Sequence, residues 1–499
     1  MSLLWPILKH AFTAPRTTAV VDDMQSYSYL KLAAAGLFMA NKIAKTTDKK
    51  HVGVMLPSSG GFAAAMLGTW MLGRVLVPLN FLLKKEDLAY IIRDSDIDTI
   101  LTVPQMLEFL GGRDSLPAET NVVELAKADF KGLPRPRWPK SAKDDDLAVI
   151  LYTSGTSGKP KGVMLSHGNL HRDVDAAIEH AGLSSADTFL GVLPQFHSFG
   201  LTALTLLPLR LKSRVVYSAR FVPKKVVELI REHRPEIFMG VPSMYGAMLS
   251  VKDATKEDFS SVRIPISGGE PLPDALYDAC KEKIGIELLE GYGLTETSPI
   301  ATWATPTQKK RHSVGRALPG VTVVTVDDND KPQGANEEGE IVIAGPIIMQ
   351  GYYKRDDLTD EVMFDLQLPD RDKPIRAFRT GDIGHIDDEG YVFITGRKKE
   401  MLIIGGENVF PREIEEVLNK HESVKASAVI GKADDMRGEV PIAFVEVEDD
   451  AEFDAGKVRS HCRELLAQYK VPREIHVVDE LPRSPTGKVL RRELKNNSD

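Results

Sequence analysis

The chain has 499 residues, of which 42% are hydrophobic and 27% charged, so it is long enough for more than one domain and has the composition of a soluble globular protein. Its net charge of −8 and pI near 5.9 argue against a nucleic-acid-binding protein, which would carry a basic field, but not against anionic small ligands. Cys280 and Cys462 lie far apart without a C-x-x-C pair, so we expect no disulfide framework or structural zinc, and a reducing, cytoplasmic environment.

No secretory or membrane-spanning segment is predicted. Residues 1–10 contain a short apolar stretch without a basic leader or a small-residue cleavage site. The most apolar segment, residues 62–73, is interrupted by Arg74 after about a dozen residues, which is too short to span a bilayer. Peripheral membrane contact and the oligomeric state are left open by these patterns.

Short apolar runs alternate with helical patterns through residues 17–110 and again through 185–300. The predicted strands cover residues 52–56, 75–79, 97–103, 147–151, 215–217, 237–239 and 264–266, and a packed helix covers residues 60–73. Repeated strand–helix–strand units indicate a mostly parallel sheet with helices on both faces. The proline-rich segment 131–140 is predicted to cross the surface within one domain, because the same rhythm resumes after it.

The pattern changes after residue 320. Strands are predicted at residues 321–326, 339–344 and 391–394, separated by acidic turns, which is typical of a small antiparallel, barrel-like section. A charged joint at 396–400 leads into an α+β pattern, with helices at 411–420 and 454–468 and strands at 426–431 and 440–448. We therefore predict an α/β protein with a large N-terminal domain, residues 1–398, and a small C-terminal domain, residues 399–499.

The most particular stretch is residues 152–162, Tyr-Thr-Ser-Gly-Thr-Ser-Gly-Lys-Pro-Lys-Gly, directly after the predicted strand 147–151. Ligands of open α/β sheets bind at such strand ends, and the glycines, hydroxyls and lysines suit an anion. The candidate phosphate-binding residues are Thr153, Ser154, Gly155, Thr156, Ser157 and Lys161. The spacing does not fit the common P-loop, and a flexible surface loop of the same composition is the alternative.

This stretch closely resembles the phosphate loop of the adenylate-forming enzymes: acyl-CoA synthetases, luciferases and the adenylation domains of peptide synthetases. A second signature of that family matches residues 291–298, which alone would be interpreted as a tight turn with an exposed acid. Its nucleotide-binding residues correspond to Gly291, Tyr292, Gly293, Thr295 and Glu296. The resemblance implies that Tyr292 packs on adenine, that Thr295 contacts phosphate, and that Glu296, together with Thr156, holds Mg²⁺.

Two further segments match the family near the ribose. The turn Gly268-Gly269-Glu270, by itself a strand-ending turn, lines the adenine and ribose pocket in the family, mainly through its backbone. Asp382 stands where the family has a carboxylate that accepts hydrogen bonds from the ribose hydroxyls, although an Asp after a glycine is also common in turns. Arg397 matches an arginine that reaches ribose or phosphate, and Lys399 occupies the hinge; a solvated charged linker is the alternative.

Three other segments match parts of the family that take part in catalysis. Lys488, in a segment that resembles the family's catalytic lysine segment, is implied to bridge the carboxylate and the α-phosphate, although terminal lysines are usually only solvated. His197, in Phe-His-Ser-Phe-Gly, is implied to lie near the substrate carboxylate, with a satisfied buried histidine as the alternative. Gly405 and Gly406 resemble the loop along which a pantetheine arm passes. Because Lys488 and these glycines share the small domain, we predict that this domain is mobile.

The resemblance implies a ligase that uses ATP, Mg²⁺ and coenzyme A, most like a medium- or long-chain fatty acyl-CoA synthetase. An acid forms an acyl adenylate and pyrophosphate, and a thiol then displaces AMP. The apolar run at residues 201–209 and the missing Asp in the acyl motif favour an apolar acid over an amino acid. The alternatives are an acyl carrier protein as acceptor, an aryl or other acid as substrate, and a nucleotide-binding scaffold without catalysis.

Overall fold

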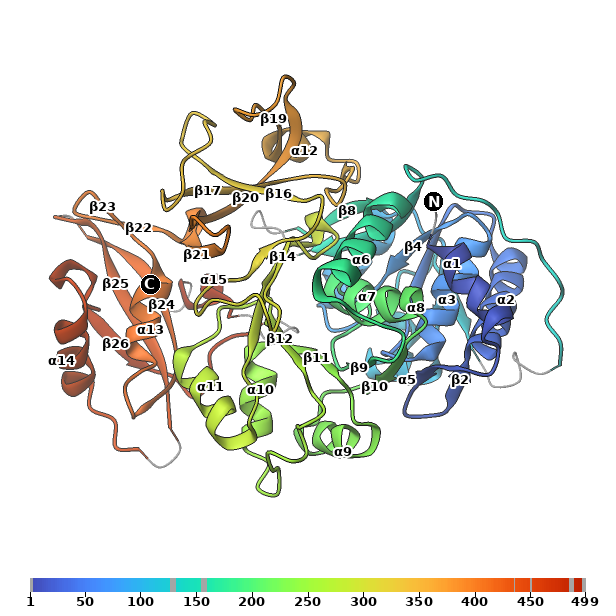
Figure 1. The fold of residues 1–499 in the computed structure, drawn as a ribbon, viewed down its shortest axis with the longest axis horizontal. Coiled ribbons are helices and arrows are strands. Elements are labelled where there is room, and N and C mark those ends of the chain that lie inside the picture. Colours follow the sequence, from blue (N-terminus) through green and yellow to red (C-terminus); the bar gives the residue numbers. More distant parts are fainter. Residues whose placement is uncertain are drawn as a thin grey trace.

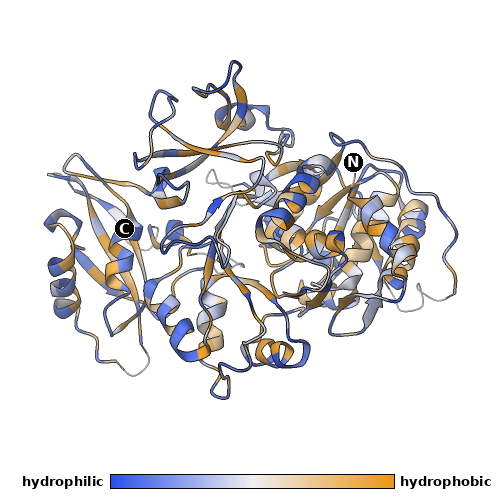
Figure 2. Ribbon diagram, viewed as in Figure 1, coloured by the Kyte–Doolittle hydropathy of each residue, from blue (hydrophilic) through white to orange (hydrophobic). Residues whose placement is uncertain are grey.

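The fold consists of four β-sheets with helices packed against them (Figure 1). It is known from a computed structural model that describes residues 3–125, 132–153, 159–434, 436–448, 451–483 and 489–495. Figure 2 shows hydrophobic residues concentrated in the strands, while the outermost helix of the C-terminal domain is largely hydrophilic. Within the described residues, no helix is both long enough and apolar enough to cross a bilayer.

A seven-stranded sheet has the order β18-β8-β7-β4-β3-β5-β6. Its strands are β3 (His51–Met55), β4 (Val75–Pro78), β5 (Thr99–Thr102), β6 (Asn121–Glu124), β7 (Leu147–Thr153), β8 (Lys161–Ser166) and β18 (Gly351–Tyr352). The strands from β7 to β6 are parallel, as predicted, but β8 pairs antiparallel with β7. The C-terminal end of the predicted loop 152–162 is therefore a strand that begins at Lys161.

A nine-stranded sheet has the order β15-β14-β13-β12-β11-β9-β10-β1-β2. Its strands are β1 (Thr18–Val21), β2 (Ser26–Ser28), β9 (Thr188–Gly191), β10 (Arg214–Tyr217), β11 (Ile237–Gly240), β12 (Ile264–Gly268), β13 (Leu289–Tyr292), β14 (Thr302–Trp303) and β15 (Arg316–Ala317). Its central strands are parallel and β2, β14 and β15 are antiparallel. The predicted alternation of strands and helices thus builds two mostly parallel sheets, which agrees with the predicted fold class.

The helices of the large domain cover these two sheets. They are α1 (Leu4–Thr13), α2 (Tyr29–Thr46), α3 (Gly60–Met71), α4 (Lys85–Asp94), α5 (Pro104–Phe109), α6 (His167–Ala181), α7 (Ser198–Leu201), α8 (Leu207–Leu211), α9 (Pro223–His233), α10 (Pro242–Leu249) and α11 (Asp274–Ala279). The predicted helix 60–73 is α3, which is buried on nearly all sides because its sequence is apolar all round. A Cβ at Gly68 would lie 2.7 Å from the Gly36 carbonyl oxygen, so glycine allows α2 and α3 to pack closely.

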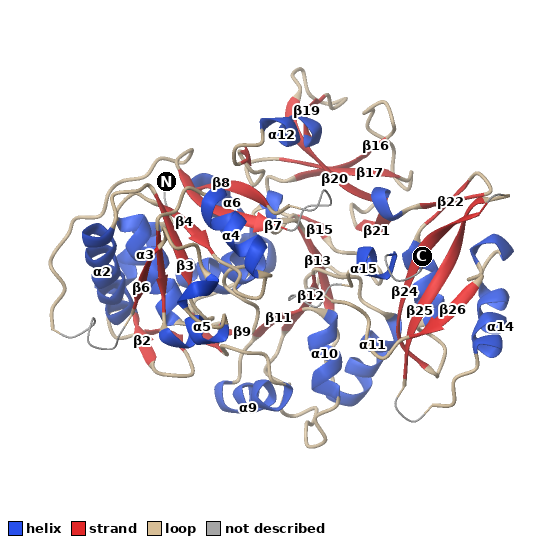
Figure 3. Cartoon of the chain, turned by 180° about the vertical axis from the view of Figure 1, so that it is seen from behind, coloured by secondary structure: helices blue, strands red, loops and turns tan. Residues whose placement is uncertain are grey.

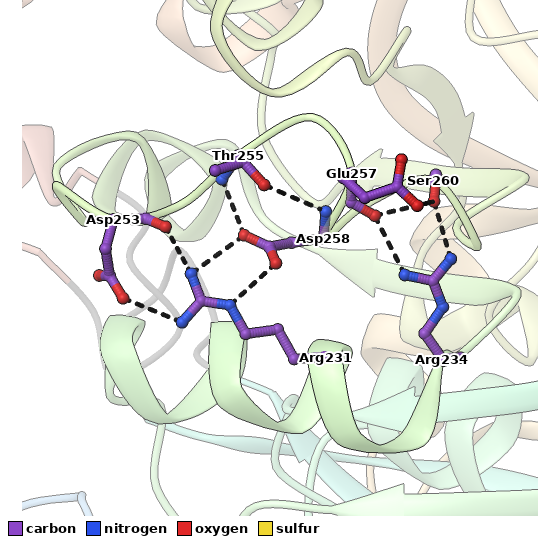
Figure 4. Close-up of polar contacts among 7 residues, drawn as sticks. All are labelled: Arg231, Arg234, Asp253, Thr255, Glu257, Asp258 and Ser260. Carbon is purple, nitrogen blue, oxygen red and sulfur yellow. Dashed lines mark hydrogen bonds and ion pairs between the residues drawn. The ribbon is translucent and has the colours of Figure 1, made fainter.

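Helix α9 is tied to the loop that follows α10 by two arginines (Figure 4). Arg231 donates to both carboxylate oxygens of Asp258, at 2.9 and 3.0 Å, and to Asp253 at 3.0 Å. The hydrogen bonds from Arg231 lower the pKa of Asp258 to about 2. Arg234 binds the Glu257 carbonyl oxygen. These contacts fix the loop that leads into β12, whose far end carries Gly268.

A small antiparallel sheet follows residue 320, as predicted. It comprises β16 (Thr322–Val326), β17 (Gly339–Ala344), β19 (Met363–Leu366), β20 (Ile375–Ile386) and β21 (Val392–Arg397), with α12 (Asp356–Val362) beside it. The long strand β20 pairs with β19 along its first half and with β21 along its second half. The predicted barrel-like section is therefore an open sheet among the described residues, because β16 and β19 form the two ends of its strand order.

The small C-terminal domain has its own five-stranded sheet and two hydrophobic clusters of its own. Its elements are β22 (Leu402–Ile404), β23 (Glu407–Val409), α13 (Pro411–Leu418), β24 (Val424–Asp434), β25 (Gly438–Val447), α14 (Ala455–Leu465), β26 (Glu474–Val477) and α15 (Arg491–Lys495). The predicted helices and strands are present, and the hairpin β22–β23 and strand β26 are additional. In Figures 1 and 3, α15 lies on the side of this domain that faces the large domain, and β22–β23 lies at its outer edge.

Candidate active site

The predicted phosphate loop leaves one strand of a hairpin and returns into the other. Thr153, the last residue of β7, pairs with Lys161, the first residue of β8. Ser154, Gly155, Thr156 and Ser157 lie outside the described residues, so their phosphate contacts remain a prediction. The hairpin nevertheless fixes both ends of the segment, because the segment begins at the end of β7 and finishes at the start of β8.

Lys161 and Glu296 meet at the ring of Tyr352. The Lys161 ammonium lies 4.1 Å from the centre of the Tyr352 ring, and the Tyr352 hydroxyl donates to Glu296 Oε1 at 2.7 Å. Tyr352 is placed here because β18 pairs with β8. Burial lowers the pKa of Lys161, and the Glu296 carboxylate opposes that effect. Tyr352 could not be predicted, because no local pattern marks a two-residue strand far from both motifs.

The residues around Glu296 fit the predicted Mg²⁺. Glu296 belongs to the 3₁₀ turn Thr295–Thr297 and is 8% exposed, and its carbonyl oxygen accepts from the Met349 amide at 2.9 Å. No group of three or more His, Cys, Asp or Glu side chains forms a metal site within the described part of the chain. A single carboxylate is still suitable, because Mg²⁺ in nucleotide sites takes most of its ligands from phosphates and water. Glu296 and the predicted ligand Thr156 are thus compatible with Mg²⁺ held mainly by a nucleotide.

A second buried carboxylate, Asp382, joins three of the predicted residues. Asp382 is 3% exposed, its Oδ1 lies 3.0 Å from Arg397 Nε, and its Oδ2 accepts from the Tyr292 hydroxyl at 2.6 Å. Arg397 is its cross-strand partner, because β20 and β21 pair in that register. The structure therefore brings together Asp382, Arg397 and Tyr292, which come from distant parts of the sequence.

The two carboxylate clusters lie within electrostatic reach of each other. Burial alone would lower the pKa of Arg397, but the carboxylates of Asp382, Glu400 and Glu296 raise it above its ordinary value. On the other side, the positive charge of Lys399 contributes to the lowered pKa of Lys161. Residues of the phosphate loop, the second signature and the joint between the domains therefore share one electrostatic environment.

The turns at the ends of β12 and β13 are adjacent. Gly268 is the cross-strand partner of Gly291, so the segment that continues to Gly269 and Glu270 lies beside the second signature. A Cβ at Gly293 would lie only 1.7 Å from the Pro299 carbonyl oxygen, so no other residue fits there. Packing against Pro299 therefore holds the backbone of this signature in place whether or not a ligand is bound.

Thr295 and the acyl motif are connected through Ser198. The Ser198 and Thr295 hydroxyls lie 3.1 Å apart and are buried. His197 precedes α7, and its Nδ1 accepts from the Phe199 amide at 3.3 Å. The predicted alternative of a buried histidine does not hold, since the His197 side chain is exposed to solvent. Desolvation by the surrounding protein atoms nevertheless lowers the pKa of His197 to about 4, so the accessible imidazole is uncharged near neutral pH. Ser198 carried no sequence signal of its own.

The joint between the domains contains a partly buried ion-pair cluster. Arg491 of α15 donates to Glu400 Oε2 at 2.8 Å and to the two oxygens of Glu415 at 2.9 and 2.8 Å. Glu400 lies in the turn Lys398–Glu400, directly after Arg397, and Glu415 lies in α13. Lys488 lies outside the described residues, and the described residues Arg483 and Val489 form an antiparallel bridge. Gly405 and Gly406 occupy the exposed β22–β23 turn with φ of 63° and 90°.

The buried Glu290 on β13 predicts a pH-dependent stability. Burial raises its pKa to about 7, although the charges of Arg412 and Arg311 oppose the shift. Because the pKa in the folded state is above its unfolded value of about 4.5, the stability that Glu290 contributes is complete below pH 4.5 and is lost as the pH rises to about 7. We expect Glu290→Gln to match the wild type in thermal midpoint near pH 4.5 and to exceed it at pH values above about 7.

Glu287→Gln is the matched control for that measurement. Hydrogen bonds from Lys309 and Tyr277 lower the pKa of Glu287, so its contribution to stability grows with pH. Glu287→Gln should therefore be less stable than the wild type at high pH, which is opposite to the change expected for Glu290→Gln. Parallel curves for wild type and Glu290→Gln across the whole range would contradict a raised pKa at Glu290.

Comparisons with known proteins agree with this arrangement. A family model described as "AMP-binding enzyme" matches residues 8–353, and one described as "AMP-binding enzyme C-terminal domain" matches residues 413–488. A long-chain-fatty-acid–CoA ligase of Bacillus subtilis strain 168 is 31% identical over 93% of this chain and 88% of its own length. A feruloyl-CoA synthase of an Amycolatopsis species is 31% identical over 98% of both chains.

A solved structure extends the similarity to the fold. The o-succinylbenzoate coenzyme A synthetase of Bacillus subtilis, in complex with ATP and a magnesium ion, has a TM-score of 0.86 and 28% identity, covering 98% of this chain and 99% of its own. The predicted family, fold class and cofactors are confirmed by these findings. The chain belongs to the AMP-binding enzyme family and is an AMP-forming acid–thiol ligase that uses ATP, Mg²⁺ and coenzyme A.

Proposed function

We propose that the protein activates a medium- or long-chain fatty acid and transfers the acyl group to coenzyme A. The carboxylate oxygen attacks the α-phosphorus of ATP, which forms acyl adenylate and releases pyrophosphate. The thiolate of coenzyme A then attacks the acyl carbonyl, which forms the thioester and releases AMP. A carboxylate is already a nucleophile, so the protein contributes positioning and charge stabilisation rather than a side-chain base.

The observation that carries this proposal is the pair of buried carboxylates. Asp382, oriented by Arg397 and Tyr292, is suited to accept hydrogen bonds from two ribose hydroxyls, since each carboxylate oxygen has more than one lone pair. Glu296, oriented by Tyr352, is suited to a phosphate-bound Mg²⁺, which would neutralise developing charge. A nucleotide that spans them would extend its phosphates toward Lys161 and the loop after Thr153.

The remaining roles follow the family pattern. We assign phosphate contacts to Ser154, Gly155, Thr156, Ser157 and Thr295, and the adenine and ribose wall to Gly268, Gly269, Glu270, Gly291 and Gly293. His197 lies next to the helical segment Thr202–Leu206, which is fully buried and mostly apolar. An accessible, uncharged imidazole at the start of an apolar segment suits an acid with one carboxylate and an apolar tail.

We further propose that the boundary between the domains lies at residues 398/399 and that the small domain rotates between the two half-reactions. One orientation delivers Lys488 to the acyl phosphate, and the other brings Gly405 and Gly406 to the pantetheine arm. The locations of α15 and β23 on opposite sides of the small domain support this idea, because rotation would turn each side in its turn toward the large domain (Figure 1).

Removing the Asp382 carboxylate should weaken nucleotide binding selectively. Asp382→Ala is expected to raise the KM for ATP by about 10–100-fold, because hydrogen bonds to charged groups contribute about 1.5–3 kcal/mol each, while the KM for the acid changes little. The KM for ATP of Asp382→Asn should lie between that of the wild type and that of Asp382→Ala. Asp388→Ala, an exposed position in the turn after the same strand, is the matched control. An equal rise in both KM values would indicate general disruption of the site instead.

The experiment that tests the proposed substrate is acid-dependent ATP–pyrophosphate exchange across a panel of acids. Saturated fatty acids of increasing chain length should give a higher kcat/KM than ferulate and 2-succinylbenzoate, the acids of two relatives. A preference for an aryl acid would overturn the fatty-acid assignment without affecting the ligase class. Comparing coenzyme A with a phosphopantetheinylated acyl carrier protein, using the best acid, tests the acceptor.

A further inference from the structure

The outer surface formed by α1, α2 and residues 132–143 has a charge unlike the rest of the chain. These three segments together carry eight Lys or Arg residues and no Asp or Glu, whereas the whole chain has 63 basic and 71 acidic residues. The basic residues are Lys9, Lys31, Lys42, Lys45, Arg135, Arg137, Lys140 and Lys143. No carboxylate among the described residues pairs with Arg135, Arg137 or Lys140. These three segments thus present basic side chains without acidic ones, with Glu124 beside Lys42 and Asp144 to Asp146 after Lys143 at the border, and we call the surface that they form the basic face.

Large apolar side chains stand on the basic face without cover. Leu133 is 96% exposed, Trp138 84%, Phe12 81% and Leu30 53%. Scattered exposed apolar residues are normal, but a cluster among basic residues marks an interaction site.

These side chains form one continuous surface rather than separate points. The Trp138 ring lies 5.8 Å from the Trp5 ring on α1, and Phe12 follows on the same face of that helix, two turns further on. The Leu30 amide donates to the Pro15 carbonyl oxygen, just beyond the end of α1, so the start of α2 lies next to Phe12.

The segment 132–143 is held against α2 although it has no regular secondary structure. Asn41 donates to the Arg135 carbonyl oxygen at 2.9 Å, and Arg137 Nε lies 3.5 Å from Asn41 Oδ1. Its three prolines restrict the backbone, so the exposed Leu133 and Trp138 are presented at low entropic cost. Figures 1 and 3 show this segment along the outer side of α2, at the end of the molecule opposite the C-terminal domain.

We propose that the basic face docks on the surface of an anionic phospholipid bilayer, with Leu133 and Trp138 inserted among the headgroups. Lys and Arg near such a surface are attracted by its negative potential, and Trp partitions favourably into the interface. Phosphate recognition alone, as in a nucleic-acid site, would not require exposed Leu, Phe and Trp side chains. Docking here leaves the C-terminal domain and the two carboxylate clusters free, and it does not depend on which acid the enzyme activates.

The test is co-sedimentation of the full chain with phosphatidylcholine vesicles that contain about one-third phosphatidylglycerol, compared with phosphatidylcholine alone. Wild-type protein should bind the anionic vesicles at about 0.1 M salt, bind the neutral ones weakly, and dissociate at about 0.5 M salt. The charge variant Arg135→Gln/Arg137→Gln/Lys140→Gln should lower partitioning by about 100-fold, since each basic residue contributes about fivefold. The apolar variant Leu133→Ser/Trp138→Ser should lower it by about tenfold or more.

The matched control is Lys457→Gln/Arg463→Gln/Leu465→Ser on α14, where exposed residues of the same kinds lie on the C-terminal domain. It should bind vesicles like the wild type, and ATP–pyrophosphate exchange without vesicles should be unchanged in all variants, which shows that they are folded. Failure of the wild type to bind anionic vesicles would overturn the proposal, and so would binding by the charge variant or the apolar variant that equals binding by the wild type. Binding to duplex DNA at the same phosphate concentration as tightly as to anionic vesicles would also overturn it, because the apolar residues would then have no role.

Discussion

Replacing Lys488 with alanine is expected to lower acid-dependent ATP–pyrophosphate exchange by about 10²–10³-fold, the usual cost of removing one group that stabilises charge in a transition state. The ammonium on its flexible side chain would otherwise bridge the attacking carboxylate and the α-phosphate. Thioester formation from supplied acyl adenylate should change only a few-fold, because the phosphoryl step is then bypassed. Both half-reactions can be measured on the same preparation, and Lys457→Ala on the exposed face of α14 is the charge-matched control.

Gly406→Leu should show the reverse pattern, because this turn belongs to the second orientation of the small domain. A leucine with φ near 90° is strained as well as bulky, so the effect of strain must be separated from the effect on the pantetheine path. Gly390→Leu is suitable for this purpose: Gly390 has φ of 81° in an exposed turn of the large domain, and no atom lies within 4 Å of an added Cβ. If Lys488→Ala and Gly406→Leu each reduced both half-reactions equally, rotation of the domain would not be required.

Arg491→Ala is expected to destabilise the C-terminal domain by about 3–5 kcal/mol, because it leaves the buried Glu415 carboxylate without its partner. Glu415 is 8% exposed and also accepts from the Val429 amide of β24 at 2.7 Å. Burial raises the pKa of Glu415, while Arg491 opposes that effect. Hydrogen exchange in β24 and β25 should therefore accelerate much more than exchange in β3 and β4 of the large domain.

The neighbour Arg492 provides the control for this prediction. Arg492 is exposed on the same short helix, and Arg492→Ala should change stability by less than about 0.5 kcal/mol. The double variant Arg491→Met/Glu415→Gln should recover much of the loss, since it removes both charges together. Unchanged exchange rates in β24 for Arg491→Ala would show that the ion pair is not needed to hold α15 in place. Because Arg491 lies three residues after Lys488 and also binds Glu400 of the joint, the same variant should slow adenylation.

Local patterns in the sequence were sufficient to predict many of the helices and strands and to recognise the family. Apolar runs and turn residues predicted seven parallel strands of the two large sheets, the change to antiparallel pairing after residue 320, and two helices and the central strands of the C-terminal domain. The strands predicted in the large sheets are β3, β4, β5, β7, β10, β11 and β12. Whether a segment forms a helix or a strand can be predicted from the periodicity of its apolar residues. That periodicity is a property of neighbouring residues and does not depend on tertiary contacts. The motifs at 152–162, 291–298 and 396–400 were recognisable because each lies in one short stretch of sequence.

The tertiary structure decided which residues support those motifs. Tyr352 orients Glu296, Ser198 contacts Thr295, and Arg491 ties the joint to α13, yet no local pattern predicts any of these contacts, even though Ser198 lies in the acyl motif and Arg491 close to Lys488. The assignment of each predicted strand to one of the two large sheets, and the raised pKa of Glu290, depend equally on which strands become neighbours. Contacts between residues far apart in the chain arise from the packing of whole sheets and domains, and a single sequence contains no local signal for that packing.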